Sequence, residues 1–188
     1  MTSNVSLARR VHAIRRHALR MGQVQGQGYI GHGLGIAVGA ALGLKRKGNP
    51  AFVYNMLSDG ELGEGSTWEA VMSAVQWKLD NLIAIVDFND QQADGKTTDA
   101  LAQVPEAGRW QAFGWFAQEV DGNDLDAVVA AFDTARNHDA PQPRVIIART
   151  KMCKGVPFLE EREITHFVQV DPDEWDKALA ILDEGAPA

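Results

Sequence analysis

Two short apolar runs frame the clearest hydrophobic pattern in the chain. Residues 51–57 and residues 82–86 are mostly apolar, which is typical of strands buried on both faces of a parallel sheet. Between them, apolar residues recur at helical spacing, namely Trp68, Val71, Met72, Val75 and Leu79. Ser66, followed three residues later by Glu69, predicts a capping box at the start of this helix. The pattern therefore predicts a strand-turn-helix-strand unit.

Similar patterns continue on both sides of this unit. Residues 144–148 form another apolar run and predict a third buried strand. Helical spacing or composition predicts further helices at residues 34–45, 125–132 and 171–183. Asn123 is expected to start the second of these helices. We expect an α/β fold, with a parallel sheet flanked by helices, in a single domain spanning residues 1–188.

An amphipathic helix is predicted near the beginning of the chain. Its apolar stripe consists of Leu7, Val11, Ile14, Ala18 and Met21, and arginines crowd its other sides. Such charges are usually a solvated face, and a nucleic-acid role is disfavoured because the whole chain is acidic, with a net charge of −7. We expect this helix to contact a partner protein instead.

Cysteine content and hydropathy bear on the cellular location of the chain. Cys153 is the single cysteine, so the chain cannot form an internal disulfide, and we do not assign this thiol a catalytic role. No apolar run is long enough for a signal-peptide core or a membrane span. A cytoplasmic location is the resulting expectation.

Polar residues follow the two strands of the central unit. Ser58-Asp59-Gly60 comes after the first strand and Asp87-Phe88-Asn89 after the second. Because parallel strands end at the same sheet edge, where ligands bind in open α/β folds, Asp59 and Asn89 are expected to lie side by side. Their oxygen atoms suit Mg²⁺, and Gly60 would let the backbone approach an anion. The alternative is that both segments are ordinary turns.

A long segment resembles a known motif. Residues 54–70 and 78–95, which contain Leu-Ser-Asp-Gly-Glu and Ile-Val-Asp-Phe-Asn-Asp, closely resemble the thiamine diphosphate motif of transketolases. The resemblance implies a thiamine diphosphate-binding fold with thiamine diphosphate and Mg²⁺ as cofactors. It also implies that Asp59, Asn89 and the main-chain carbonyl of Gln91 ligate the metal.

Further cofactor contacts are implied by the same resemblance. Residues 28–39 are similar to the glycine-rich loop of the family, so Gly28 and Ile30 would contact the cofactor. His166 stands at the family's spacing after Lys-Gly-Val and would touch the diphosphate together with Gly60.

Two glutamates have both structural and family-based interpretations. Glu64 can interact with the positive end of the central helix, which is a sufficient structural explanation for it. The resemblance implies instead that Glu64 lies in a hydrogen-bonded path between paired active sites at a dimer interface. Glu61 is expected to hold the turn near the cofactor.

The chain departs from the family pattern at three places. Ser58 replaces a glycine before Asp59. A family segment with further active-site histidines is missing near residues 28–34, so the chain looks internally shortened. A pyrimidine-binding domain is also missing, and with it the glutamate that activates the cofactor.

The resemblance implies the N-terminal, diphosphate-binding subunit of a split transketolase, which would move a two-carbon ketol group between sugars or sugar phosphates. Activity would require a C-terminal partner with the pyrimidine-binding domain, in a homodimeric contact or a heterotetramer. A noncatalytic assembly or regulatory remnant, or a subunit of another thiamine diphosphate enzyme, remains an alternative. The Gly-x-Gly-x-x-Gly match at residues 26–31 follows a predicted helix instead of a strand, which disfavours a dinucleotide site.

Overall fold

The structure is a computed structural model that describes Leu7, Arg9, His12 and residues 32–92, 95–101, 106–162 and 170–185. The chain divides into two compact units, Met1–Tyr29 with Lys151–Ala188, and Ile30–Thr150. Leu7, Arg9 and His12 are helical, and the rest of the predicted first helix lies outside the described residues. A single domain over the whole chain stays a prediction.

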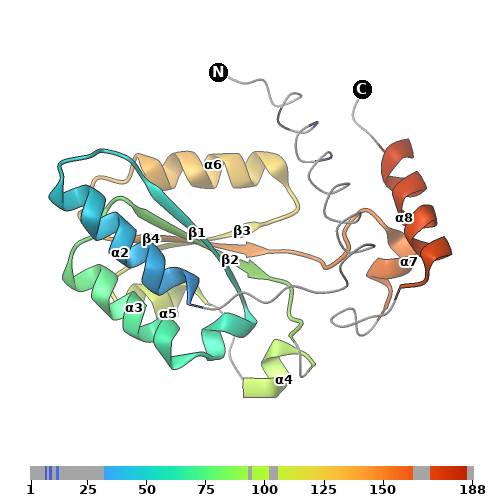
Figure 1. Cartoon of the computed structure of the whole chain (residues 1–188), viewed down its shortest axis with the longest axis horizontal. Coiled ribbons are helices and arrows are strands. Elements are labelled where there is room, and N and C mark those ends of the chain that lie inside the picture. The colour runs from blue at the N-terminus through green and yellow to red at the C-terminus, as the bar shows by residue number, and fades with distance from the viewer. Residues whose placement is uncertain are drawn as a thin grey trace. The chain divides into compact units, whose positions relative to one another are not determined.

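A four-stranded parallel sheet forms the centre of the larger unit. Its strands are β1 (Val53–Ser58), β2 (Leu82–Phe88), β3 (Phe116–Asp121) and β4 (Arg144–Arg149). They are ordered β1-β2-β4-β3, and each neighbouring pair is parallel (Figure 1). This sheet confirms the predicted α/β fold and its three predicted strands. β3 was not predicted, because its sequence Phe-Ala-Gln-Glu-Val-Asp is half polar and mostly half-buried at the sheet edge.

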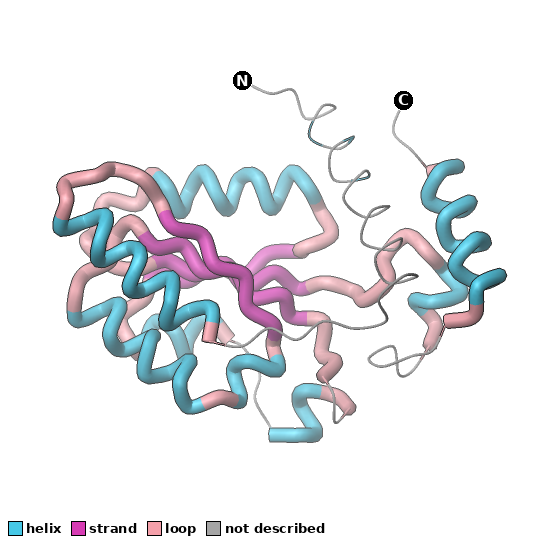
Figure 2. Tube along the Cα trace, viewed as in Figure 1, coloured by secondary structure: helices cyan, strands magenta, loops and turns pink. Residues whose placement is uncertain are grey.

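Helices cover both faces of this sheet. The helices α2 (Gly33–Arg46), α3 (Gly65–Gln76) and α5 (Ala107–Ala112) lie on one face, and α6 (Leu125–Arg136) lies on the other (Figure 2). The larger core is on the first face, where Trp110 and Trp115 are fully buried against the sheet and α3. Burial of these apolar side chains is the main stabilising term for the layered arrangement.

Two predicted helix starts are wrong. α3 begins at Gly65 and Glu64 is its N-cap, without a side-chain hydrogen bond to the helix, so Ser66 lies inside the helix and forms no capping box. α6 begins after Asp124, whose Oδ1 accepts hydrogen bonds from two backbone amides of the first turn. Asn123 lies one residue too early, because two neighbouring residues of N-cap type compete for the position.

Three short helical segments were not predicted. They are the 3₁₀ helix η1 (Gly60–Gly63), α4 (Thr97–Leu101) and α7 (Pro157–Glu160). Segments this short contain too few residues for a helical hydrophobic period. η1 and α4 lie in the larger unit and position the residues of the candidate site.

The smaller unit is described through α7 and α8 (Pro172–Glu184). α8 confirms the predicted last helix and is started by a capping box between Asp171 and Glu174. The helices pack through a small apolar cluster of Val156, Leu159, Ala178 and Leu182. Among the described residues of both units, no helix is long and apolar enough to cross a membrane.

Candidate functional site

Asp59 and Asn89 follow neighbouring strands at one edge of the sheet. Asp59 comes directly after β1 and Asn89 directly after β2. The parallel register pairs Ser58 with Asp87, so the two strands end at the same level. Both residues therefore lie at the carboxyl edge of the sheet, as the sequence pattern predicts.

Asp59 is a buried carboxylate with several hydrogen-bond donors around it. The residue is only 1% exposed. Its Oδ1 accepts a hydrogen bond from the amide of Gly60 at 2.9 Å, and its Oδ2 accepts one from the Thr97 hydroxyl at 2.8 Å. Burial raises the pKa of Asp59, whereas the bonds from Thr97 and Gly60 lower it. The nearby negative charge of Asp87 raises the pKa further.

The loop after β2 folds back to deliver Thr97 to Asp59. Asp90 adopts a left-handed backbone conformation, with φ of 59°. Its carbonyl accepts from the amide of Thr97 at 3.3 Å, and its Oδ1 accepts from the amide of Thr98 at 3.2 Å. The side chain of Asn89 accepts from the amide of Gln91 at 2.9 Å. These bonds fix the turn that carries two of the predicted metal ligands, Asn89 and Gln91.

Glu61 stabilises the turn between β1 and η1. This glutamate is only 6% exposed, and its Oε2 accepts a hydrogen bond from the amide of Ser58 at 2.9 Å. The hydroxyl of Ser58 accepts from the amide of Glu61 at 3.3 Å, so the serine at this position takes part in the turn. A Cβ on Gly60 would lie 3.3 Å from Oε1 of Gln92, which leaves little room for a side chain there.

Glu64 lies at the start of α3 and is largely exposed to solvent. Its Oε2 lies 4.0 Å from Nδ1 of His32 and accepts from the Ser66 hydroxyl at 3.4 Å. The pair with His32 is an ion pair only when the histidine is protonated. Both side chains are open to solvent in this unit, with 77% of His32 and 43% of Glu64 exposed.

Three predicted cofactor residues lie outside the described residues. They are Gly28, Ile30 and His166. Their assignments therefore stay predictions.

Two contributors to the site were not found from the sequence. Thr97 is separated from Asp59 by 38 positions, and no local sequence pattern marks its hydroxyl as a partner. The Thr150 hydroxyl, just after β4, donates to Asp87 and so links a third strand end to the site. Because three parallel strands end here, a search for polar residues after every strand would have found Thr150.

The donor atoms fit a magnesium ion held mainly by the cofactor. Among the described residues there is no group of three or more His, Cys, Asp or Glu side chains that could hold a metal. Mg²⁺ often uses only one or two carboxylates together with phosphate oxygens and water. A carboxylate accepts about four hydrogen bonds, and the amides of Gly60 and Asp90 and the Thr97 hydroxyl supply three to Asp59. Asp59 therefore keeps a lone pair for a cation.

Comparison with known proteins agrees with this geometry. The family model for the transketolase thiamine diphosphate binding domain matches residues 24–182. A transketolase family protein of Sinorhizobium fredii is 61% identical over 161 residues, which are 86% of this chain and 58% of that protein. An apulose-4-phosphate transketolase subunit of Actinobacillus succinogenes is 42% identical over 155 residues, which are 82% of this chain and 55% of that protein.

The fold agrees as well. The crystal structure of transketolase from Campylobacter jejuni superposes with a TM-score of 0.64 at 24% sequence identity, covering 85% of this chain and 30% of that one. The chain spans just over half the length of the two curated relatives, which agrees with the predicted shortening. Its expected location near residues 28–34 lies mostly outside the described residues. From the matched domain and these relatives, the chain belongs to the transketolase family and carries its thiamine diphosphate binding domain.

Proposed function

We propose that this chain is the N-terminal subunit of a transketolase-type enzyme and binds thiamine diphosphate together with Mg²⁺. The enzyme would transfer a two-carbon ketol group from a ketose to an aldose. The family domain and the relative named as one subunit of a transketolase support this proposal. The single observation that carries the metal site is the buried carboxylate of Asp59 at the carboxyl edge of the sheet.

Asp59, Asn89 and the main-chain carbonyl of Gln91 would hold the magnesium ion. Gly60 and His166 would contact the diphosphate, and Gly28 and Ile30 would contact the rest of the cofactor. Thiamine diphosphate supplies the nucleophilic carbon that the amino acid side chains lack. The protein would therefore contribute binding and orientation.

The side chains around these ligands hold them in place before the cofactor binds. Thr97 and Gly60 fix the two oxygens of Asp59, and Asp90 fixes the turn that carries Asn89. Glu61 restrains the backbone between β1 and η1, which sets the direction of the Gly60 amide. Preorganised ligands of this kind lose less freedom on binding and so bind more tightly.

Glu64 would take part in communication between two active sites. It is exposed beside His32 in the described unit, so its carboxylate is accessible to a neighbouring protein chain. One hydrogen bond from Glu64 to a partner across an interface would connect the two cofactors. This role places the chain in a homodimeric contact or in a heterotetramer with its partner.

The chain would need a C-terminal partner that carries the pyrimidine-binding domain. The curated relatives are nearly twice the length of the matched region. The substrate class is a sugar or a sugar phosphate, because the relative from Actinobacillus succinogenes is named for apulose 4-phosphate. The partner would supply the group that activates the cofactor.

A reconstitution assay tests the catalytic role. The chain is mixed with a pyrimidine-binding subunit encoded beside its gene, and ketol transfer is followed with ketose phosphate donors and aldose acceptors. We expect turnover from the mixture and none from either protein alone. The Asp59→Asn variant should abolish turnover, whereas Asp99→Asn, a change of the same kind in the first turn of α4, should retain it.

Two results of this assay would contradict the proposal. One is full turnover by the mixture that contains the Asp59→Asn variant, which would show that the metal site lies elsewhere. The other is assembly of the two subunits with bound cofactor but without transfer to any sugar. That second result would favour an assembly or regulatory role.

A further inference from the structure

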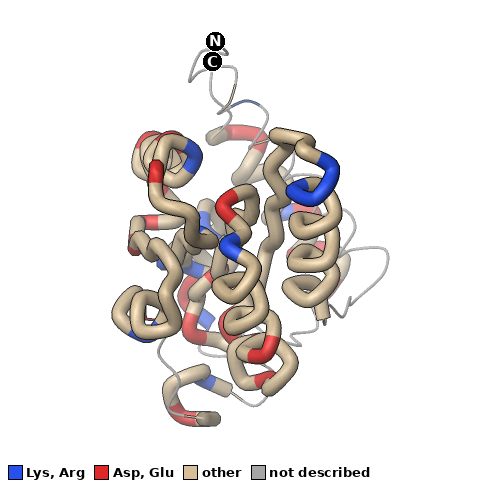
Figure 3. The backbone as a smooth tube through the Cα atoms, turned by 90° about the vertical axis from the view of Figure 1, so that its left-hand side faces the viewer, with Lys and Arg blue, Asp and Glu red and all other residues tan. Residues whose placement is uncertain are grey.

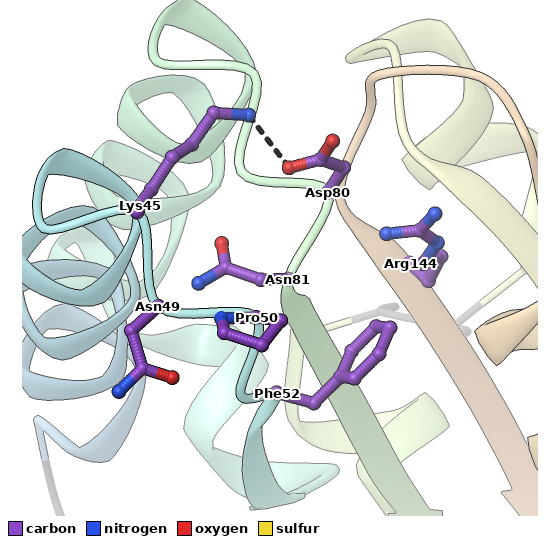
Figure 4. Close-up of a pocket in the computed structure, with 8 residues that line it drawn as sticks. Lys45, Asn49, Pro50, Phe52, Asp80, Asn81 and Arg144 are labelled. Carbon is purple, nitrogen blue, oxygen red and sulfur yellow. Dashed lines mark hydrogen bonds and ion pairs between the residues drawn. The ribbon is translucent and has the colours of Figure 1, made fainter.

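A cavity lies at the amino edge of the sheet, opposite the proposed cofactor site. Its volume is about 360 Å³, and it is bounded by the end of α2 and the segments that lead into β1, β2 and β4 (Figure 4). Figure 3 views the unit from this edge, where Lys45 and Arg46 form the basic last turn of α2. Strands of six residues separate the two edges by roughly 20 Å. The cavity is therefore distinct from the site at Asp59.

Arg144 is the central charged residue of this cavity. It is the first residue of β4 and is only 4% exposed. Its Nη2 donates a hydrogen bond to the carbonyl of His138 at 2.5 Å. Its Nε and Nη1 are buried and have no hydrogen-bond partner within residues 32–92, 95–101, 106–162 and 170–185. Because unpaired buried donors on a cation are costly, they indicate a place for an acceptor.

The neighbouring carboxylate does not fill that place. Asp80 favours the charged form of Arg144, but its Oδ1 is held by Nζ of Lys45 at 2.6 Å. The same ammonium donates to the carbonyl of Lys78 at 2.5 Å. Two cations and one anion therefore face the cavity, and the guanidinium of Arg144 is the charge left over. The ring of Phe52 lies 5.9 Å from its central carbon.

Asn81 adds an acceptor to these donors. This residue is 9% exposed, and its Nδ2 donates to the carbonyl of Ala41 at 3.0 Å. Its Oδ1 is buried and has no donor among the described residues. The cavity thus offers two adjacent donors from Arg144 and one acceptor from Asn81.

We propose that this cavity binds a small oxyanion that carries a hydroxyl group, such as a hydroxy carboxylate or a protonated phosphate. Two oxygens of the anion accept from Nε and Nη1 of Arg144, and the hydroxyl donates to Oδ1 of Asn81. An arginine fork matches the geometry of carboxylate and phosphate oxygens. The volume admits a molecule of a few carbon atoms, below the usual size of a drug pocket. This inference does not depend on the proposed cofactor site.

The test is a titration of the full chain followed by ¹⁵N nuclear magnetic resonance. Glycolate, acetate and inorganic phosphate are added separately, with chloride keeping the ionic strength constant. We expect a saturable shift of the Arg144 Nε–H signal, with glycolate bound at least about threefold more tightly than acetate because it adds one hydrogen bond. Comparison of glycolate with inorganic phosphate identifies which source of the oxyanion is preferred.

Two variants separate this site from general attraction between charges. Arg144→Met should weaken glycolate binding about tenfold or more, because it removes the charged fork. Arg149→Met removes the same charge at the opposite end of β4 and should leave the affinity unchanged. If Arg144→Met fails to fold, the titration of the wild-type signal still decides the question. Absence of a saturable Arg144 shift with all three probes, or equal affinity in Arg144→Met, overturns the proposal.

Discussion

At the scale of single residues, the position of Asp59 could be predicted and its hydrogen-bond partner could not. A polar residue directly after a buried strand reaches the carboxyl edge of a parallel sheet, so the sequence was sufficient to place Asp59 and Asn89 there. Thr97 reaches Asp59 only because Asp90 takes a left-handed conformation that reverses the loop. Such a reversal depends on tertiary contacts that leave no periodic signal in the sequence.

Removal of the Thr97 hydroxyl should destabilise the larger unit. In Thr97→Val, the buried carboxylate of Asp59 loses a hydrogen bond, which costs about 1 to 3 kcal/mol of unfolding free energy. Urea unfolding measures the change. The matched control is Thr98→Val, which keeps the backbone bond to Asp90 and should cost much less. Equal losses in the two variants would contradict the assignment of the Thr97 hydroxyl to Asp59.

At the scale of helices and strands, apolar patterns located elements better than their ends. β2 and β4 were found because they are buried along most of their length, whereas β3 was missed at the sheet edge. The start of α6 was placed one residue early because Asn123 and Asp124 are both suitable N-caps. Only the hydrogen bonds of the first turn distinguish the two residues.

The N-cap of α6 provides a direct comparison. Asp124→Ala removes the acceptor for two backbone amides, and we expect unfolding free energy to fall by about 0.5 to 2 kcal/mol. Asn123→Ala should cause a smaller loss, since the amide of Asn123, which this change retains, makes its bond to Asp121. Urea unfolding of the two variants tests this order, and a larger loss in Asn123→Ala would refute it.

The link between α5, β3 and β4 should depend on pH. The pKa of Glu119 is lowered, first by the hydrogen bond from the amide of Ala107 and then by Arg149. Because the folded pKa lies below the ordinary value of 4.5, this stabilisation is present above pH 4.5 and is lost as pH falls through the folded pKa.

Glu119→Gln isolates this charge, because glutamine still accepts a hydrogen bond from Ala107. We expect the wild type to be more stable than Glu119→Gln at pH 7, and the difference to shrink as pH falls below 4.5. Unfolding curves for both proteins from pH 7 to acid measure it. A difference that stays constant or grows toward low pH would be inconsistent with the lowered pKa.

At the scale of the whole molecule, the family and fold could be predicted because the motif around Asp59 and Asn89 is long and lies on regular elements. The substrate and the partner are not fixed by this chain, since it spans just over half the length of its curated relatives. The cavity at Arg144 also escaped prediction. A buried arginine at the start of a strand is visible in the sequence only as one more charged residue.

The central claim is that Asp59 supports magnesium-dependent binding of thiamine diphosphate. Calorimetric titration of the isolated chain with thiamine diphosphate, with and without Mg²⁺, measures this most directly. We expect saturable binding only with Mg²⁺, its loss in Asp59→Asn and its retention in Asp99→Asn. Equal affinity of the wild type and Asp59→Asn for the cofactor in the presence of Mg²⁺ would contradict the account.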